Sequence, residues 1–251
     1  MPARTTPAAA DDTRYQEMAP PPDLATHLAC AWVRRVGPPS ARPIVPDGCT
    51  DLMWITDGGQ AHLVVAGPDT RAHPDGLGPG TSIAAVRFRP GAARDVFGVP
   101  LDALRDQRPD LADVWGRAPA DALADAVADA ERPEAVLARA VGDRLGTTPL
   151  DPAMQHVVRT LGDTRVPAPV RGLADAIGLS ERQLHRRCTA SFGYGAKTLH
   201  RVLRFQRALR RAQAGDDLAR VAHESGYVDQ AHLARDVSAL TDTTMTALLG
   251  G

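Results

Sequence analysis

The sequence predicts an α+β fold: a β-rich, small barrel-like N-terminal part, a helical connector, and an all-α C-terminal part with two helix-turn-helix units joined by a linker helix. Three observations predict it. Short apolar runs divided by turn residues fill the stretch from about residue 44 to residue 90. Helical spacing of apolar residues begins near residue 118. Two segments about 48 residues apart repeat one pattern of apolar, alanine and glycine positions.

The β-rich part is indicated by three apolar runs, DLMWIT (51–56), QAHLVVAGP (60–68) and SIAAVRFRPG (82–91). Asp57-Gly58-Gly59 joins the first two runs and predicts a tight hairpin. Helical spacing at 118–145 is interrupted by Pro133 and predicts one or two amphipathic helices. We expect disorder at 1–22, the β-rich sensor or partner domain at 23–116, the connector at 117–150 and the double helix-turn-helix domain at 151–251. The stretch 162–170 contains prolines and predicts a hinge.

Composition excludes several classes of protein. The 251 residues are 43% hydrophobic, enough for real cores, and no apolar run approaches the roughly 18 residues of a membrane span. The N-terminus lacks the apolar stretch of a signal peptide, so we expect no membrane contact and a cytoplasmic, nucleoid-associated location. Cys30, Cys49 and Cys188 are far apart in sequence and are expected to be reduced thiols.

Charge is distributed unevenly along the chain. Residues 1–150 hold 15 Arg and Lys against 20 Asp and Glu, whereas 151–251 hold 14 against 10. The segment 182–215 contains nine basic residues and no acid. Such a segment suits a polyanion, and it equally suits a solvated arginine-rich helix.

The repeat consists of LADAIGLSERQLHRR (173–187) and VAHESGYVDQAHLAR (221–235). Ala174 and Ala222 stand where two helices would cross closely. Gly178 and Gly226 stand where the first helix of each copy would end, a position that often needs a positive φ. Ser180, with Gln183 in a capping box, and Asp229 then predict the N-caps of two recognition helices, at about 180–191 and 229–240. A basic helix at 196–214 would join the two units.

With these motifs, residues 152–249 resemble the DNA-binding domain of the AraC/XylS family of bacterial transcription regulators. The N-terminal stretches 46–54, 67–69, 87–91 and 111–116 resemble a subgroup whose β-rich domain is poorly characterised. The resemblance implies sequence-specific binding of double-stranded DNA, and of RNA polymerase if the protein is an activator. A small-molecule effector and a homodimer formed through 118–145 stay open, as do the promoter and the sign of regulation.

The chain departs from the family pattern at the end of the second unit. Val237 replaces the usual aromatic residue, and Asp242-Thr243-Thr244-Met245 replaces a Gly-x-Thr-Pro ending. The valine fills less of the core than an aromatic side chain, and the changed ending is a weaker signal for the end of the helix. We therefore expect the second unit to be less stable, or to bind DNA less tightly, than is usual in the family.

The exposed N-terminal positions of a recognition helix enter the major groove. Leu184, Cys188 and Leu233 are expected to point inward. The residues that match the family's base-contact positions are Arg182, His185 and Arg186 in the first copy, and Gln230 and Arg235, with His232 beside them, in the second. Arginine suits guanine and glutamine suits adenine. Lys197, Arg201 and Arg204 are assigned to phosphate. For each residue the alternative is an exposed side chain without a partner.

Competing chemistry finds weaker support. Ala196 stands where a phosphate-binding loop needs glycine before Lys197, and His27, His62 and His73 are scattered, so no catalytic residue, metal or other cofactor is expected. Asp47, Cys49 and Asp51 alternate at a strand entry. They suggest either a turn stabilised by Asp47 or a polar group beside a buried thiol. The remaining alternative function is a β-barrel enzyme with an incidental helical domain.

Overall fold

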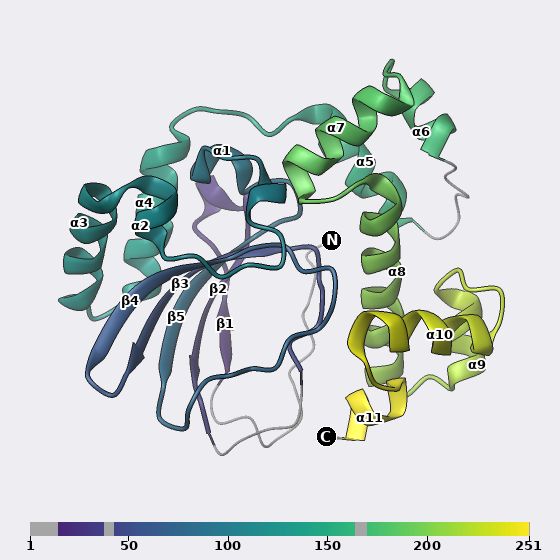
Figure 1. The fold of residues 1–251 in the computed structure, drawn as a ribbon, viewed down its shortest axis with the longest axis horizontal. Helices are drawn as coiled ribbons and strands as arrows, with labels where there is room; N and C mark the ends of the chain where they lie inside the picture. The colour runs from purple at the N-terminus through teal and green to yellow at the C-terminus, as the bar shows by residue number, and fades with distance from the viewer. Residues whose placement is uncertain (1–14, 38–42, 164–169, 251) are drawn as a thin grey trace.

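The computed structural model describes residues 15–37, 43–163 and 170–250 (Figure 1). The strands are β1 (Gln16–Met18), β2 (Leu28–Arg35), β3 (Thr50–Asp57), β4 (Gln60–Ala66) and β5 (Ser82–Phe88), and the 3-10 turns are η1 (Pro22–Leu24) and η2 (Leu101–Ala103). The helices that follow β5 are α1 (Arg94–Phe97), α2 (Leu111–Trp115), α3 (Arg117–Ala128) and α4 (Pro133–Leu145). The C-terminal helices are α5 (Pro152–Gly162), α6 (Val170–Ala176), α7 (Glu181–Phe192), α8 (Ala196–Gln213), α9 (Leu218–Glu224), α10 (Gln230–Thr241) and α11 (Met245–Gly250).

The strands form one antiparallel sheet in the order β1-β2-β5-β3-β4. Strands β3 and β4 are joined by Gly58 and Gly59, whose φ angles of 56° and 84° confirm the predicted tight hairpin. The expected disorder at 1–22 is wrong for 16–18, because β1 pairs with β2 and the adjacent Tyr15 ring lies 5.6 Å from that of Trp32. Residues 1–14 lie outside the described part of the chain, as does most of the expected hinge.

One face of the sheet is covered by helices α1 to α4 (Figure 1). Leu52, Val86 and Phe88 of the sheet share an apolar core with Val127 of α3 and Val141 of α4. The opposite face carries a smaller cluster that includes Cys30, Trp32 and Ile83. The helices predicted at 118–145 are therefore present, and they complete the core of the sheet.

The C-terminal helices form two small cores, one at each end of α8. Leu199 and Val202 belong to the first core, which includes residues of α5, α6 and α7. Phe205 and Leu209 belong to the second, which includes residues of α9, α10 and α11. Figure 1 shows α7 and α10 near opposite ends of α8. The predicted linker helix thus joins the two units through one continuous apolar stripe.

Candidate nucleic-acid interface

The first helix-turn-helix unit consists of α6 and α7. Gly178 ends the first helix with a φ of 66°, a left-handed conformation that glycine adopts without steric cost. Ser180 accepts a hydrogen bond from the Gln183 backbone N–H, and the Gln183 side chain accepts one from the Ser180 backbone N–H. This confirms the predicted capping box. Leu184 and Cys188 are fully buried, so α7 faces its partner helix as expected.

Arg182 and Arg186 are exposed on α7, and among the described residues neither has an ion-pair partner. His185 is exposed as well, but its ring lies against the N-cap of α8: a Cβ on Gly195 would lie only 2.7 Å from the His185 Nδ1. The predicted base-contact set of the first unit therefore shares one surface. Its two arginines are free to bind, whereas His185 also packs against α8.

The second unit consists of α9 and α10. Gly226 has a φ of 81°, and the Tyr227 N–H donates to the Ala222 carbonyl, which closes the turn. The Asp229 carboxylate accepts a hydrogen bond from the His232 backbone N–H at 2.6 Å and caps α10. The predicted glycine turn and cap are confirmed, and Leu233 is buried against them.

Gln230 and Arg235 are exposed on α10, whereas His232 is half-buried. The His232 ring meets the Tyr227 ring edge-on at 5.2 Å, and its Nδ1 accepts a weak hydrogen bond from the Val228 N–H at 3.4 Å. Through these two contacts His232 stabilises the turn between α9 and α10. Gln230 and Arg235 are the predicted base-contact residues that remain fully available in this unit.

Arg201 and Arg204 of α8 have an acidic partner within the protein. Both were expected to bind DNA phosphates, yet both donate to the buried Asp236 of α10, at 2.5 Å and 2.8 Å. The Tyr227 hydroxyl donates to the same carboxylate at 3.1 Å, and the Arg204 guanidinium lies 4.1 Å from the Tyr227 ring centroid. The two arginines are thus occupied in holding α10 to α8. Lys197 is exposed and remains available to a phosphate.

The pKa of Asp236 follows from this arrangement. Burial alone would raise it, but the hydrogen bonds and positive charges of Arg204 and Arg201 outweigh burial and lower the pKa below its ordinary value. Asp236 is therefore an anion in the folded protein near neutral pH. Sequence periodicity did not point to it, because its partners lie 32 and 35 residues away.

The N-terminal domain contacts both units. At the first, the Arg105 guanidinium donates to the Gly193 carbonyl at 3.2 Å, and a Cβ on Gly193 would lie 2.5 Å from the Pro68 Cγ. At the second, the Ala72 N–H donates to the Leu240 carbonyl at 2.7 Å. Between them the Gln206 amide donates to the Pro46 carbonyl at 2.6 Å.

Tyr194 lies at the centre of this contact. It is buried against Gly48, and among the described residues its hydroxyl has no hydrogen-bond partner. Burial, followed by the negative charge of Asp47, raises the pKa of this hydroxyl, so it stays protonated. Gly48 has a φ of 82°, a left-handed conformation that glycine adopts without steric cost, and a Cβ there would only touch the Tyr194 hydroxyl at 3.7 Å.

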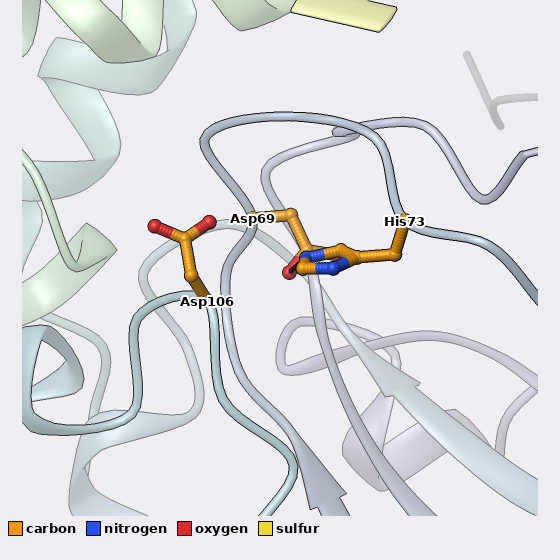
Figure 2. A group of neighbouring side chains, drawn as sticks. All are labelled: Asp69, His73 and Asp106. Atoms are coloured by element: carbon orange, nitrogen blue, oxygen red, sulfur yellow. Dashed lines mark hydrogen bonds and ion pairs between the residues drawn. The ribbon is translucent and has the colours of Figure 1, made fainter. Parts of the chain in front are cut away.

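Asp69, His73 and Asp106 form the cluster drawn in Figure 2. Their ligand atoms lie within 4.8 Å of one another, a spacing that could suit a cation. However, Asp69 accepts hydrogen bonds from both Arg108 and His73, at 2.7 Å and 2.9 Å, and Asp106 accepts from the Thr70 backbone N–H at 2.7 Å. These bonds tie together the loops that meet Gly193, which gives the cluster a structural role.

A second polar group lies on the sheet. The Cys49 N–H donates to the Asp47 carboxylate at 2.8 Å, which confirms the turn expected at Asp47. Asp51 accepts hydrogen bonds from the Trp32 indole at 2.9 Å and from Arg87 at 3.0 Å. Burial raises the pKa of the Cys49 thiol, and the nearby Asp47 charge raises it further, so the thiol stays protonated. Cys30, Cys49 and Cys188 are all free thiols.

A hollow of about 230 Å³ separates α7 from α1. It is lined by Arg94, Asp151, Arg186, Arg187, Ala190 and Ser191. Asp151 caps α5 and pairs with Arg187 at 2.5 Å, so Arg94 and Arg186 remain as the unpaired charges around it among the described residues. Arg94 could not be predicted from local sequence patterns, because only the packing of the two domains brings it beside α7.

Two family models match the chain. A helix-turn-helix domain model matches residues 173–250, and a model of a domain of unknown function matches residues 16–110. No curated protein matches the sequence. None of the helices in the described part of the chain is long and apolar enough to cross a membrane.

Solved structures of ToxT from Vibrio cholerae are similar to this chain. ToxT from strain O395 has 8% identity and a TM-score of 0.49, over 88% of this chain and 96% of that one. A P21 crystal form of ToxT has 9% identity and a TM-score of 0.48, over 94% and 98%. ToxT from strain SCE256 with a bound unsaturated fatty acid has 9% identity and a TM-score of 0.42, over 83% and 88%.

Two capped helices, each with exposed cationic and amide side chains, stand at the ends of one linker helix within a matched helix-turn-helix domain. This combination defines a DNA-binding transcriptional regulator. The helix-turn-helix domain at residues 173–250 is of the AraC type, and it follows an N-terminal domain built on a five-stranded sheet.

Proposed function

We propose that the protein binds one asymmetric DNA site through two neighbouring major-groove segments, with α7 in the first and α10 in the second, and catalyses no reaction. The observation that carries this proposal is the attachment of both capped helices to α8 through separate apolar cores. Successive major-groove faces on one side of B-DNA repeat every ~34 Å, so two helices that act together need a fixed separation. A single continuous helix of 18 residues supplies it.

Base recognition is assigned to Arg182 and Arg186 in the first segment and to Gln230 and Arg235 in the second. Each is exposed on the recognition helix of its unit. Arginine makes two hydrogen bonds to guanine, and glutamine makes two to adenine, each worth ~1–3 kcal/mol of discrimination. Lys197 is assigned to a phosphate because it is exposed and has no ion-pair partner among the described residues.

The N-terminal domain is proposed to control binding through its contacts with Gly193, Gln206 and Leu240. A small-molecule effector or a partner protein that shifts the loops bearing Pro46, Pro68 and Ala72 would change the relative placement of α7 and α10. A thermal-shift screen of the full chain against metabolites tests for an effector, because a compound that binds the folded state raises its melting temperature.

Selection of bound sequences from random DNA by the purified full chain tests the DNA-binding proposal. We expect a two-part consensus with its halves about ten base pairs apart. Arg235→Ala should relax the preference at one base position. Lys197→Ala should weaken binding to all sequences alike and reduce the dependence of affinity on salt. Uniform losses for both variants would contradict the assigned roles, and enrichment of no sequence would favour the enzyme alternative.

A further inference from the structure

Val228 is a large apolar side chain that the fold leaves in water. It precedes the N-cap of α10 by one residue and is 87% exposed. Among the described residues only one other large hydrophobic side chain, Ile44, is counted as exposed, at 42%. A single exposed apolar residue needs no explanation on most surfaces, but this one stands at the entrance of a recognition helix.

The turn that carries Val228 is fixed on both sides. Before it, the Tyr227 N–H donates to the Ala222 carbonyl, and the Tyr227 hydroxyl is held by Asp236. After it, Asp229 caps α10, and the Val228 N–H itself donates to the His232 ring. A β-branched side chain also has few rotamers. The valine is therefore presented in a restricted geometry, at little further entropic cost on binding.

Val228 has no counterpart in the first unit. Leu179 and Tyr227 each follow the turn glycine and donate an N–H to the carbonyl of the alanine five residues earlier, and neither side chain is exposed. The first unit passes from Leu179 directly to its N-cap, whereas the second has one extra residue, Val228, and its side chain is exposed. The exposed valine is a property of the second unit and not of the motif.

Chemistry limits what Val228 can contact on DNA. Its side chain forms no hydrogen bond and gains nothing beside a phosphate. In the major groove the apolar group on the base edges is the 5-methyl group of thymine, with which small apolar side chains make contact. We propose that Val228 contacts a thymine methyl group and specifies thymine at one position beside the bases read by α10. This inference rests on the proposed function, because it requires α10 to enter the major groove.

The test replaces thymine by deoxyuridine, which removes the methyl group and keeps base pairing. Each thymine of the selected site is replaced in turn, and the affinity of the full chain is measured. We expect one position at which deoxyuridine weakens wild-type binding about 4-fold, the effect of removing one buried methyl group. Val228→Ala should bind the thymine site as weakly as the wild type binds the deoxyuridine site, and should no longer distinguish the two.

Two further variants make the result specific. Val228→Thr retains one methyl group and the β-branched shape, so it should keep part of the discrimination. Ile44→Ala removes the other exposed apolar side chain, which belongs to the N-terminal domain and pairs with His73 near the C-terminal end of α10 rather than at its N-cap, and it should leave the discrimination intact. Two observations would show that Val228→Ala is folded: a circular dichroism spectrum like that of the wild type, and an unchanged sequence preference in the part of the site that α7 reads.

The outcomes separate this inference from the proposed function. A two-part consensus without any position sensitive to the methyl group would overturn the role of Val228 alone, and so would discrimination that persists in Val228→Ala. Failure to enrich any sequence would overturn the proposed function and this inference with it.

Discussion

The two helix-turn-helix units are fixed to the rest of the molecule by different means. The end of α7 packs against the N-terminal domain, where Gly193 meets Pro68 and Leu101. The second recognition helix is held to α8 by the Asp236 carboxylate and its two arginine partners, and it accepts the Ala72 backbone hydrogen bond at Leu240. The first helix is therefore coupled to the N-terminal domain through close packing, whereas the second is coupled to it through a backbone hydrogen bond and is also fixed by ion pairs between α10 and α8.

The largest effect is expected from Asp236→Ala. It removes the shared acceptor of Arg201, Arg204 and Tyr227, and leaves partly buried cations without a counter-charge. Loss of one partner of a buried ion pair costs about 3 kcal/mol of unfolding free energy or more. Urea unfolding measures the loss. Asp216→Ala, which leaves Glu224 as the remaining partner of Arg211, is the control and should cost less than about 1 kcal/mol. Equal losses of unfolding free energy in the two variants would contradict the role of Asp236 in holding α10 to α8.

The ion pairs of Asp236 with Arg201 and Arg204 also predict that the free energy of unfolding depends on pH. The folded-state pKa of Asp236 is lowered from its ordinary value of 3.8, so its contribution is fully present above about pH 4 and is lost as the pH falls through the lowered value. The difference in unfolding free energy between the wild type and Asp236→Asn should therefore be constant from pH 5 to pH 7 and shrink in acid. A difference that grows in acid would mean that the carboxylate is not the stabilising form.

Gly193→Ala tests the attachment of the first unit. A methyl group there meets Pro68 at 2.5 Å and the Leu101 carbonyl at 3.2 Å, on a backbone with a φ of 81°. Gly215→Ala has the same kind of backbone, with a φ of 90°, and nothing within 4 Å. Each variant should lose ~1–2 kcal/mol to backbone strain. Gly193→Ala should lose about 2 kcal/mol more through overpacking, as measured by thermal unfolding. Equal losses would mean that the domains do not pack closely at Gly193.

The smallest effects concern the helix ends. Asp242 ends α10 with a φ of 53°, where the first unit has a glycine, Gly193, at the end of α7, and Gly178 ends α6 with a φ of 66°. Asp242→Gly should raise the free energy of unfolding by about 1 kcal/mol, and Gly178→Ala should lower it by a similar amount. Chemical denaturation of both variants provides the measurement. A loss of stability in Asp242→Gly would show that its side chain, rather than its backbone, terminates the helix.

Local patterns explain what the sequence could predict. The hairpin at Gly58 and Gly59, the caps at Ser180 and Asp229, and the burial of Leu184 all depend on residues close in sequence, and all are confirmed. The missing Gly-x-Thr-Pro ending was expected to weaken the last stop signal. The structure shows Asp242 in the left-handed conformation there, and it shows Val237 fully buried.

The misses involve partners that are distant along the chain. Strand β2 (LACAWVRR) was not predicted individually, because its alanines have low strand propensity, although the turn residues Gly37, Pro38 and Pro39 follow it closely in the sequence. Arg201 and Arg204 looked like phosphate ligands because nothing in their own helix neutralises them. Their acid lies on α10, and only the packing of two helices reveals it.

The central claim is that α7 and α10 recognise separate parts of one DNA site. Random-sequence selection with the wild type, Arg186→Ala and Arg235→Ala measures it most directly. The account predicts a two-part consensus in which Arg186→Ala loses preference only in one part and Arg235→Ala only in the other, about one helical turn away. Loss of preference in the same part by both variants, or a consensus with a single part, would contradict it.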